Sequence, residues 1–87
     1  MNIQQLKTFV TVIESGSFSQ AARVLGVSQP AVTMQVQNLE TDIGESLLDR
    51  RYRRIELTEA GRVLVPYARE MLKEADQARA DIAGLSG

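Results

Sequence analysis

Four arginines within five positions are the densest group of side chains in the sequence that could do chemistry: Arg50, Arg51, Arg53 and Arg54. Guanidinium groups this close repel one another, whereas phosphate groups bind them through charge-assisted and often bidentate hydrogen bonds. Charge runs are also common on exposed surfaces, so a solvated loop with no ligand is the alternative. The arginines therefore indicate contact with nucleic acid if the neighbouring elements support it.

Other reactive side chains are scarce. The sequence contains no histidine and no cysteine, which removes imidazole bases, thiol nucleophiles, disulfides and the usual zinc ligands. The carboxylates are scattered rather than paired, so hydrolysis by a carboxylate pair is unsupported. We expect no enzyme, and no cofactor or metal site in this domain.

The 87 residues suit one small domain, and ten basic against eleven acidic side chains leave a net charge of −1. Bulk positive charge therefore cannot supply affinity for DNA, and the local arrangement of charge decides. The sequence has no apolar run of membrane-spanning length and no secretory pattern at its start. We expect a cytoplasmic protein that does not contact a membrane.

The elements that must position the arginines begin with residues 17–40, which contain two helical patterns separated by Gly26 and Val27. In the first pattern, Ser17 is the expected N-cap, Gln20 completes a capping box, and Gly26 ends the helix. Its apolar residues recur three or four positions apart: Phe18, Ala21, Ala22 and Leu25. This spacing predicts a short helix with one buried face.

Ser28 is the expected N-cap of the second pattern, and Pro30 lies in its first turn, where a missing N–H does no harm. The stripe expected to be buried consists of Val32, Val36, Leu39 and Ile43. The opposite stripe is small, uncharged and able to form hydrogen bonds: Pro30, Thr33, Met34 and Gln37. Two such helices at a glycine turn are typical of a helix-turn-helix, in which the second is the recognition helix. A helical hairpin that only completes a core is the alternative.

A supporting helix is expected before this pair, from Ile3 to Ser15, with Asn2 as N-cap and Gly16 at its end. Its apolar face comprises Ile3, Leu6, Phe9, Val10 and Ile13. After the recognition helix, residues 47–57 change to a period of two around the arginines. This alternation predicts a small hairpin with the arginines at its tip.

A long final helix is expected from Glu59 to about Ala83, with Thr58 as its N-cap. A heptad seam recurs at steps of four and three: Leu64, Ala68, Met71, Ala75, Ala78, Ile82 and Leu85. An exposed seam is marginal in water, so the helix either folds back on its own domain or packs on the same helix of a second copy, and we favour the second copy. Gly84, Ser86 and Gly87 are interpreted as a hinge.

These elements predict a mainly α fold: a winged helix-turn-helix of three helices and a two-stranded wing in residues 1–58, then a dimerisation or linker helix in residues 59–87. A binding module that uses the same groove for a protein partner is the competing class. Dependence of affinity on salt separates the two, because only DNA binding releases counterions from phosphates.

One set of residues carries a family resemblance: Gln5, Leu6, Phe9, Gly16, Ser17, Phe18, Ala21, Ala22, Leu25, residues 27–33, Leu39, Glu40, Gly44, Leu47, Arg50, Leu57, Thr58, Ala60 and Gly61. In these positions the chain resembles the N-terminal DNA-binding domain of LysR-type transcriptional regulators. The resemblance implies a fragment of a longer bacterial regulator, whose effector-binding domain lies outside this chain. It also implies antiparallel pairing of the long helices in a homodimer, with tetramers possible in full-length proteins.

We expect a set of residues on the recognition helix and the wing to contact DNA: Ser28, Gln29, Pro30, Ala31, Thr33, Met34, Gln37, Arg50, Arg51, Arg53 and Arg54. The resemblance carries over to the matching residues Gln29, Pro30, Ala31, Thr33 and Arg53, and the other positions rest on the uncharged stripe and the arginine cluster. Gln29 can bind adenine bidentately, and Ala31 and the Thr33 methyl suit thymine methyls. Arg53 matches the family's basic residue at the minor groove. The other three arginines are expected on the DNA backbone, with pairing of Arg50 to Glu40 as the alternative.

Some positions depart from the family pattern. Met34 stands where many members carry an arginine, and Gln37 and Asn38 are neutral where basic residues are frequent. Leu48 replaces a common phenylalanine under the wing. We expect these differences to change which bases are preferred rather than how the domain docks on an interrupted inverted repeat, with half-sites about one helical turn or a multiple apart.

Overall fold

Four helices form the fold of the computed structural model, which describes residues 1–85. They are α1 (Ile3–Ser15), α2 (Phe18–Leu25), α3 (Gln29–Ile43) and α4 (Glu59–Gly84). The expected caps are all present: the side chains of Asn2, Ser17, Ser28 and Thr58 each accept a hydrogen bond from the backbone N–H three positions on. At α1 the capping box is complete, whereas at α2 only the Ser17 half of the predicted box is formed. The mainly α fold is confirmed.

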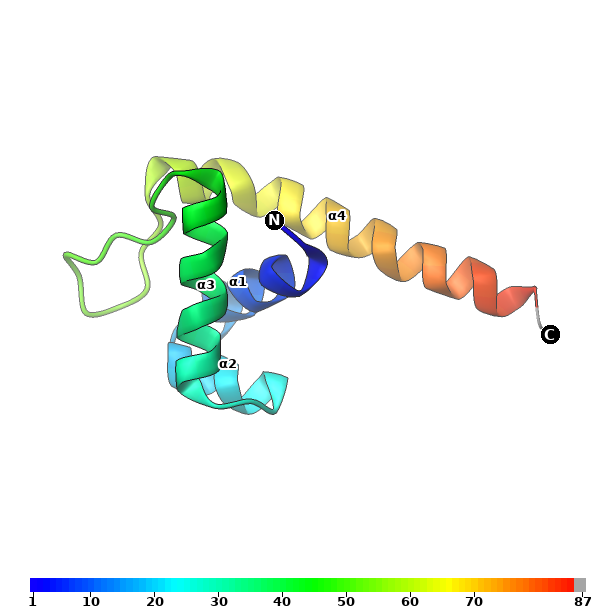
Figure 1. Ribbon diagram of the computed structural model, residues 1–87, viewed down its shortest axis with the longest axis horizontal. Helices are drawn as coiled ribbons and strands as arrows, with labels where there is room; N and C mark the ends of the chain where they lie inside the picture. Colours follow the sequence, from blue (N-terminus) through cyan, green and yellow to red (C-terminus); the bar gives the residue numbers. More distant parts are fainter. Residues whose placement is uncertain (86–87) are drawn as a thin grey trace.

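The turn between α2 and α3 depends on Gly26, whose φ of 69° is left-handed. Side chains other than glycine rarely adopt this conformation, and the open space around this residue shows that backbone freedom, not room, is what the position requires. The turn lets α2 and α3 pack against each other while α1 contacts both of them and α4. In Figure 1, α1 lies behind α3, with α2 at its lower end.

The core is built around α1, and each of the other three helices contributes buried side chains to it. Its fully buried side chains include Phe9 and Val12 from α1, Ala21 from α2, and Val32, Val36 and Leu39 from α3. Two residues expected in the core are exposed instead, Ile3 and Ile43. Both lie at helix ends, where the helix axis has left the core. The sequence pattern also missed Val12, and Thr8, which is buried and accepts a hydrogen bond from the Gln4 side chain at 3.5 Å.

The segment between α3 and α4 differs from the predicted two-stranded wing. Within the described residues it forms no strands, only a single antiparallel bridge between Leu48 and Leu57. Two backbone hydrogen bonds flank the bridge, from Asp49 N to Glu56 O at 2.8 Å and from Thr58 N to Leu47 O at 3.0 Å. Pairing stops there because the tip residues are exposed and charged, and a two-stranded ribbon without further strands is only marginally stable. Residues 49–56 are therefore called the wing loop.

Helix α4 begins against the base of the wing loop. Gly61 is buried there, and a Cβ on it would lie 2.2 Å from the backbone oxygen of Leu47. Further along, Ala68 is fully buried, and Leu64 and Met71 pack against the core. The first half of the predicted seam thus folds back on its own domain, in agreement with the alternative interpretation of the seam.

The second half of α4 extends away from the core, opposite to the wing loop (Figure 1). Ala78 is exposed, and Ile82 and Leu85 are 66% and 86% exposed. Gly84 is the last residue of α4, and Ser86 and Gly87 lie outside the described residues, so the hinge stays a prediction. None of the four helices combines the length and apolar character that crossing a membrane would require.

Candidate nucleic-acid interface

The outer face of α3 presents the uncharged stripe that the sequence predicts. Pro30, Met34 and Gln37 are exposed, Thr33 is half-buried, and with Gln29 they line a shallow depression of about 580 Å³. Val32, Val36 and Leu39 are fully buried on the opposite face, so the rotation of α3 about its axis is fixed. The side chains predicted to contact bases therefore share one accessible surface.

The first turn of α3 is suited to an anion. Its N-terminal turn contains no acidic residue, and Ser28 at the cap is exposed, with its hydroxyl accepting from Ala31 N at 3.2 Å. Pro30 has no N–H and Ala31 N is bonded to the cap, so the N–H of Gln29 and the positive end of the helix dipole are what favour a phosphate at this position. Ala31 is half-buried beside it. Ser28, Gln29 and Pro30 thus stand where a nucleic-acid backbone could meet the helix.

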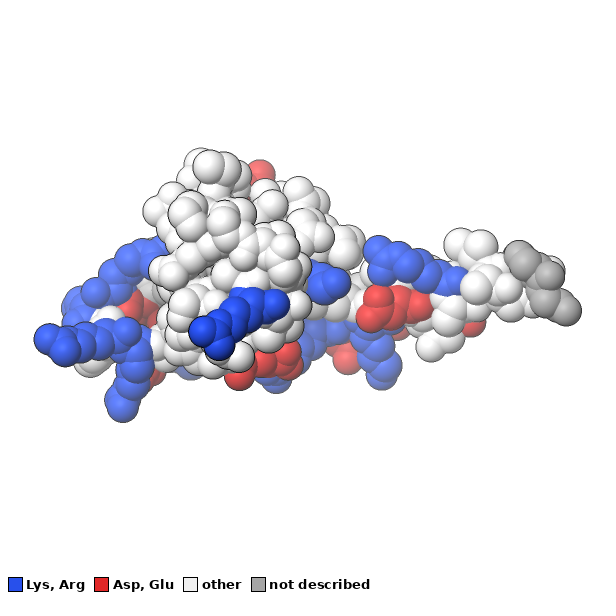
Figure 2. All heavy atoms as spheres, turned by 90° about the horizontal axis from the view of Figure 1, so that it is seen from below, with Lys and Arg blue, Asp and Glu red and all other residues white. Residues whose placement is uncertain are grey.

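The wing loop holds its arginines at the neighbouring end of the molecule. Figure 2 shows their positive charge gathered at that end, beside a broad surface without charged side chains. Arg50, Arg51, Arg53 and Arg54 are all exposed. The structure therefore places the uncharged face of α3 and the cationic cluster of the segment that follows it on neighbouring parts of the surface.

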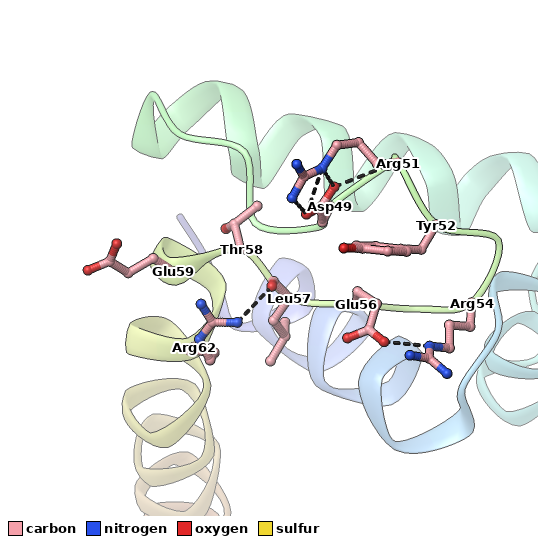
Figure 3. A pocket seen from close by; sticks show the side chains of 9 residues that line it. All are labelled: Asp49, Arg51, Tyr52, Arg54, Glu56, Leu57, Thr58, Glu59 and Arg62. Carbon is pink, nitrogen blue, oxygen red and sulfur yellow. Dashed lines mark hydrogen bonds and ion pairs between the residues drawn. The ribbon is translucent and has the colours of Figure 1, made fainter.

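Three of the four arginines are paired with carboxylates of their own chain. Arg50 Nη2 lies 2.9 Å from Glu40 Oε1, and Arg54 Nε lies 2.5 Å from Glu56 Oε1. Arg51 donates twice to Asp49, from Nε to Oδ1 at 2.9 Å and from Nη2 to Oδ2 at 2.6 Å, and its guanidinium lies 5.6 Å from the centre of the Tyr52 ring (Figure 3). Within residues 1–85, Arg53 has no such acidic partner.

Pairing with Arg51 changes the titration of Asp49. Hydrogen bonds from the Arg51 side chain and backbone N–H lower the pKa of Asp49 to about 2, and Asp49 raises the pKa of Arg51. Both groups are thus charged at any physiological pH. The guanidinium of Arg51 is the open side of this pair: the Arg51 side chain is 79% exposed and the Asp49 side chain 17% exposed.

A cleft of about 540 Å³ separates the wing loop from the first turn of α4 (Figure 3). Arg62 lines it together with Arg51 and Arg54, and its Nη1 donates to Leu57 O at 3.1 Å. The sequence pattern did not single out Arg62. Its position one turn after the Thr58 cap was the available clue, because the start of this helix must lie beside the hairpin that precedes it.

The residues expected to mediate dimerisation fall into two groups. Ala68 is fully buried in its own chain and offers no surface to a second copy in this conformation, and Leu64, Met71 and Ala75 are half-buried. Ala78 and Ile82 are exposed. The structure also exposes Val63 and Tyr67 on α4, two apolar side chains that the heptad pattern left out. Contact with a second copy remains a prediction for all of these residues.

Two helices joined at a left-handed glycine, with an uncharged outer face on the second and an arginine cluster beside it, define a helix-turn-helix DNA-binding domain. The chain belongs to the LysR family of bacterial regulatory helix-turn-helix proteins, whose family model matches residues 3–62. It is thus the DNA-binding domain of a LysR-type transcriptional regulator, not an enzyme, as the sequence predicts.

Relatives and solved structures agree with this family. The HTH-type transcriptional regulator TfdT of Cupriavidus pinatubonensis is 50% identical over 72 residues, covering 83% of this chain and 32% of its own length. The crystal structure of the BenM DBD with catB site 1 DNA has a TM-score of 0.94 at 34% identity, covering 100% of this chain and 98% of that one. The CbnR DBD–DNA complex has a TM-score of 0.89 at 41% identity, covering 100% of both. The chain spans about a quarter to a third of the length of the curated relatives it matches.

Proposed function

We propose that this chain binds double-stranded DNA sequence-specifically as a homodimer, with α3 in the major groove and the wing loop at the flanking minor groove and backbone. The observation that supports this best is the uncharged, accessible face of α3 beside the arginine cluster. The similar BenM and CbnR domains are both crystallised with DNA, which supports the same partner for this chain. The regulator it belongs to would act at promoter DNA in the bacterial cytoplasm.

The roles on α3 follow from side-chain chemistry. Gln29 can donate to and accept from an adenine edge, while Ala31 and Thr33 offer methyl groups to thymine. Met34, which is 61% exposed, can make apolar contacts only. We expect base preference to arise from these contacts, with Ser28, Pro30 and Gln37 beside them on the adjoining backbone.

The roles on the wing loop follow from its ion pairs. Arg53, without an acidic partner among the described residues, is the arginine most available to the minor groove. Arg51 and Arg54 are the exposed members of their pairs, 79% and 80% exposed, so their guanidinium groups are accessible to phosphates that could replace Asp49 and Glu56. Arg50 is held by Glu40, whose side chain is mostly buried, so a direct DNA contact by Arg50 is the less favoured role.

Homodimerisation is supported by the distal half of α4. Ala78 and Ile82 are exposed there, and Ala75 is half-buried beside them, on a helix that extends beyond the core. A projecting helix with exposed apolar side chains is stabilised when another helix covers them. Pairing of two copies would place two recognition helices on the half-sites of one inverted repeat. The division of the chain at residue 58 is part of this proposal, although the first half of α4 also completes the core of residues 1–58.

The proposed DNA binding is tested by measuring affinity against salt concentration, with a selected site and with random DNA. We expect the logarithm of the association constant to fall linearly with the logarithm of salt, by about 0.9 per neutralised phosphate. We also expect the selected site to bind more tightly than random DNA at every salt concentration. A flat response with both DNAs would reject this function and favour a module that binds a protein.

The proposed dimer is tested by an Ile82→Lys variant, with Ala80→Lys as the matched control on the opposite side of α4. Lysine at position 82 should produce monomers, as measured by sedimentation. It should also weaken binding to an inverted repeat but not to a single half-site. Lysine at position 80 should leave dimers intact. Replacement of Met71 is unsuitable for this test because Met71 packs against the core. Dimers that survive Ile82→Lys would show that another surface joins the copies.

A further inference from the structure

The carboxylate of Glu40 is the point at which the wing segment is attached to the recognition helix. Its Oε2 accepts from Leu47 N at 2.7 Å and, at longer range, from Leu48 N at 3.4 Å. The Ser46 hydroxyl lies 3.3 Å from the same oxygen but donates its one proton to Leu48 O at 2.9 Å. Oε1 of Glu40 accepts from Arg50 Nη2 at 2.9 Å. Only 13% of the Glu40 side chain is exposed. One side chain of α3 thus binds three donors from the segment that leads into the wing loop.

Among the hydrogen bonds of the described residues, only those to Glu40 join residues 46–50 to α3. Leu47 and Leu48 are also buried in the core, so apolar packing holds the same segment. The bridge and the backbone hydrogen bonds at the base of the loop join its two ends to each other, not to the helix. The wing loop lacks a sheet to orient it, so its direction depends on how residues 46–50 are held. Glu40 satisfies backbone N–H groups there that would otherwise need another acceptor.

We propose that Glu40 is a positioning residue: it fixes the wing loop relative to the base-contacting face of α3 and so determines which phosphates the loop can reach. This inference rests on the proposed function, because it concerns the register of two DNA contacts. Glu40 lies seven residues after Thr33, about 10 Å along a rigid helix. Glu40 thereby contributes to the distance between Thr33 and the wing loop, together with the buried Leu47 and Leu48.

The same arrangement assigns a role to Arg50. Its guanidinium neutralises the carboxylate that holds the main chain, so it acts through Glu40 instead of on DNA. Loss of Arg50 should leave the bonds to Leu47 N and Leu48 N in place, whereas loss of the Glu40 charge should release the segment. This difference separates a positioning role from a direct contact.

The test is a Glu40→Gln variant compared with wild type by hydroxyl-radical footprinting on a selected inverted repeat. The amide keeps the size of the side chain but replaces one accepting oxygen with an NH₂ group, so a donor faces either Leu47 N or Arg50. We expect loss of protection at the outermost phosphates with the central protection retained. The salt slope should fall by about 0.9 for each outer phosphate that the variant no longer neutralises.

A control variant matched in stability, Val12→Ala, separates positioning from general destabilisation. Val12 is fully buried in α1 and lies outside the wing segment, so its loss should lower stability while leaving the outer protection unchanged. A folded Glu40→Gln protein that protects the outer phosphates as wild type does would overturn the proposal. If wild type itself gives no outer protection, the proposed DNA contact of the wing loop fails instead.

An Arg50→Met variant keeps the inference falsifiable if Glu40→Gln does not fold. We expect Arg50→Met to keep most of the outer protection, since the main-chain hydrogen bonds to Glu40 remain. Arg53→Ala provides the comparison for a direct contact. Loss of outer protection in Arg50→Met as large as in Arg53→Ala would make Arg50 a DNA contact and overturn its assignment to Glu40.

Discussion

The recognition helix α3 and the wing loop are neighbours on the surface, but they are fixed by different means. Three fully buried side chains, Val32, Val36 and Leu39, hold α3 against the core, and its outer face carries no charge. The wing loop buries little beyond its base and carries four exposed arginines, three of them in ion pairs. Apolar packing is not screened by salt, whereas exposed charge pairs are.

The difference assigns the two regions separate parts in DNA recognition. A helix with a fixed rotation can present side chains to base edges at defined positions, which sequence readout requires. A group of exposed cations suits phosphates, which are the same at every base pair. The following predictions alter one region at a time, beginning with the largest expected effect.

Gly61→Ala should have the largest effect because it disrupts the packing of α4 against the base of the wing loop. The added Cβ would meet Leu47 O at 2.2 Å and the Leu57 side chain at 2.9 Å. Overpacking against a backbone atom leaves no easy relief, and we expect destabilisation of about 1–3 kcal/mol or more. The measurement is the midpoint of urea unfolding.

Gly84→Ala is the control for this substitution. Gly84 ends the same helix with nothing within 4 Å of an added Cβ. Alanine there should be neutral or stabilise by a few tenths of a kcal/mol, since glycine is the weaker helix former. Equal midpoints for Gly61→Ala and wild type would mean that the base of the loop moves freely, contrary to the packing described.

Replacing Arg53 and Arg54 with alanine should weaken binding to all DNA sequences alike. Phosphate contacts carry no sequence information, so affinity should fall by a similar factor on selected and random sites, and the salt slope should fall by about 1 for each phosphate that is no longer bound. Arg53→Ala alone should account for most of the weakening, because Arg54 is already paired with Glu56. Arg69→Ala, on α4 and away from both regions, removes one charge and is the control matched to Arg53→Ala. An unchanged slope would exclude the wing loop from the DNA interface.

Met34→Arg should change base preference instead of general affinity. Met34 is exposed within the depression on α3, so an arginine there can reach a base edge without disturbing the core. A bidentate contact to guanine discriminates by about 1–3 kcal/mol. Selection from random DNA should therefore enrich guanine at one position of each half-site, while Met34→Leu should select the wild-type sequence. If wild type, Met34→Arg and Met34→Leu all select the same sequence, the side chain at position 34 does not contact a base.

The contrast between the two regions also explains how much the sequence could predict. The caps and the glycine turn are local features, so Asn2, Ser28 and Gly26 could be assigned correctly from their immediate neighbours. The outer face of α3 followed from its period. The predicted wing strands are replaced by a single bridge in the described residues. The prediction was wrong because alternation over a few residues cannot show whether cross-strand partners exist.

Long-range contacts were the hardest to predict. The heptad seam of α4 contains apolar residues of two kinds, and the pattern could not distinguish them. Ala68 is buried in the core of its own chain, whereas Ile82 is exposed on the distal half of the helix. Pairing of Arg50 with Glu40 was an alternative from the sequence, but the hydrogen bonds from Leu47 and Leu48 depend on how the chain turns after α3. The need for glycine at position 61 likewise comes from a backbone atom fourteen residues earlier.

Asp49→Asn should have the smallest effect, and in the opposite direction: we expect tighter binding to DNA. Asp49 accepts from Arg51 through two oxygens and so competes with phosphate for the same guanidinium. The Arg51 side of the pair is exposed to solvent and salt, so the gain should be on the order of two- to five-fold at low salt and should vanish at high salt. Asp76→Asn, which removes a carboxylate paired with Arg79 on α4, is the matched control.

The pH dependence of this effect follows from the lowered pKa of Asp49. The pKa of Asp49 is about 2 in the folded chain and 3.8 for an ordinary aspartate. The pair with Arg51 therefore contributes its full stabilisation at pH values above 3.8, and this stabilisation is lost as the pH falls through 2. The ratio of the DNA affinity of Asp49→Asn to that of wild type should therefore be constant between about pH 5 and pH 8. Weaker binding by Asp49→Asn would mean that Asp49 holds Arg51 in its DNA-contacting position, and that the wing loop is preorganised like α3 instead of exchanging its partners.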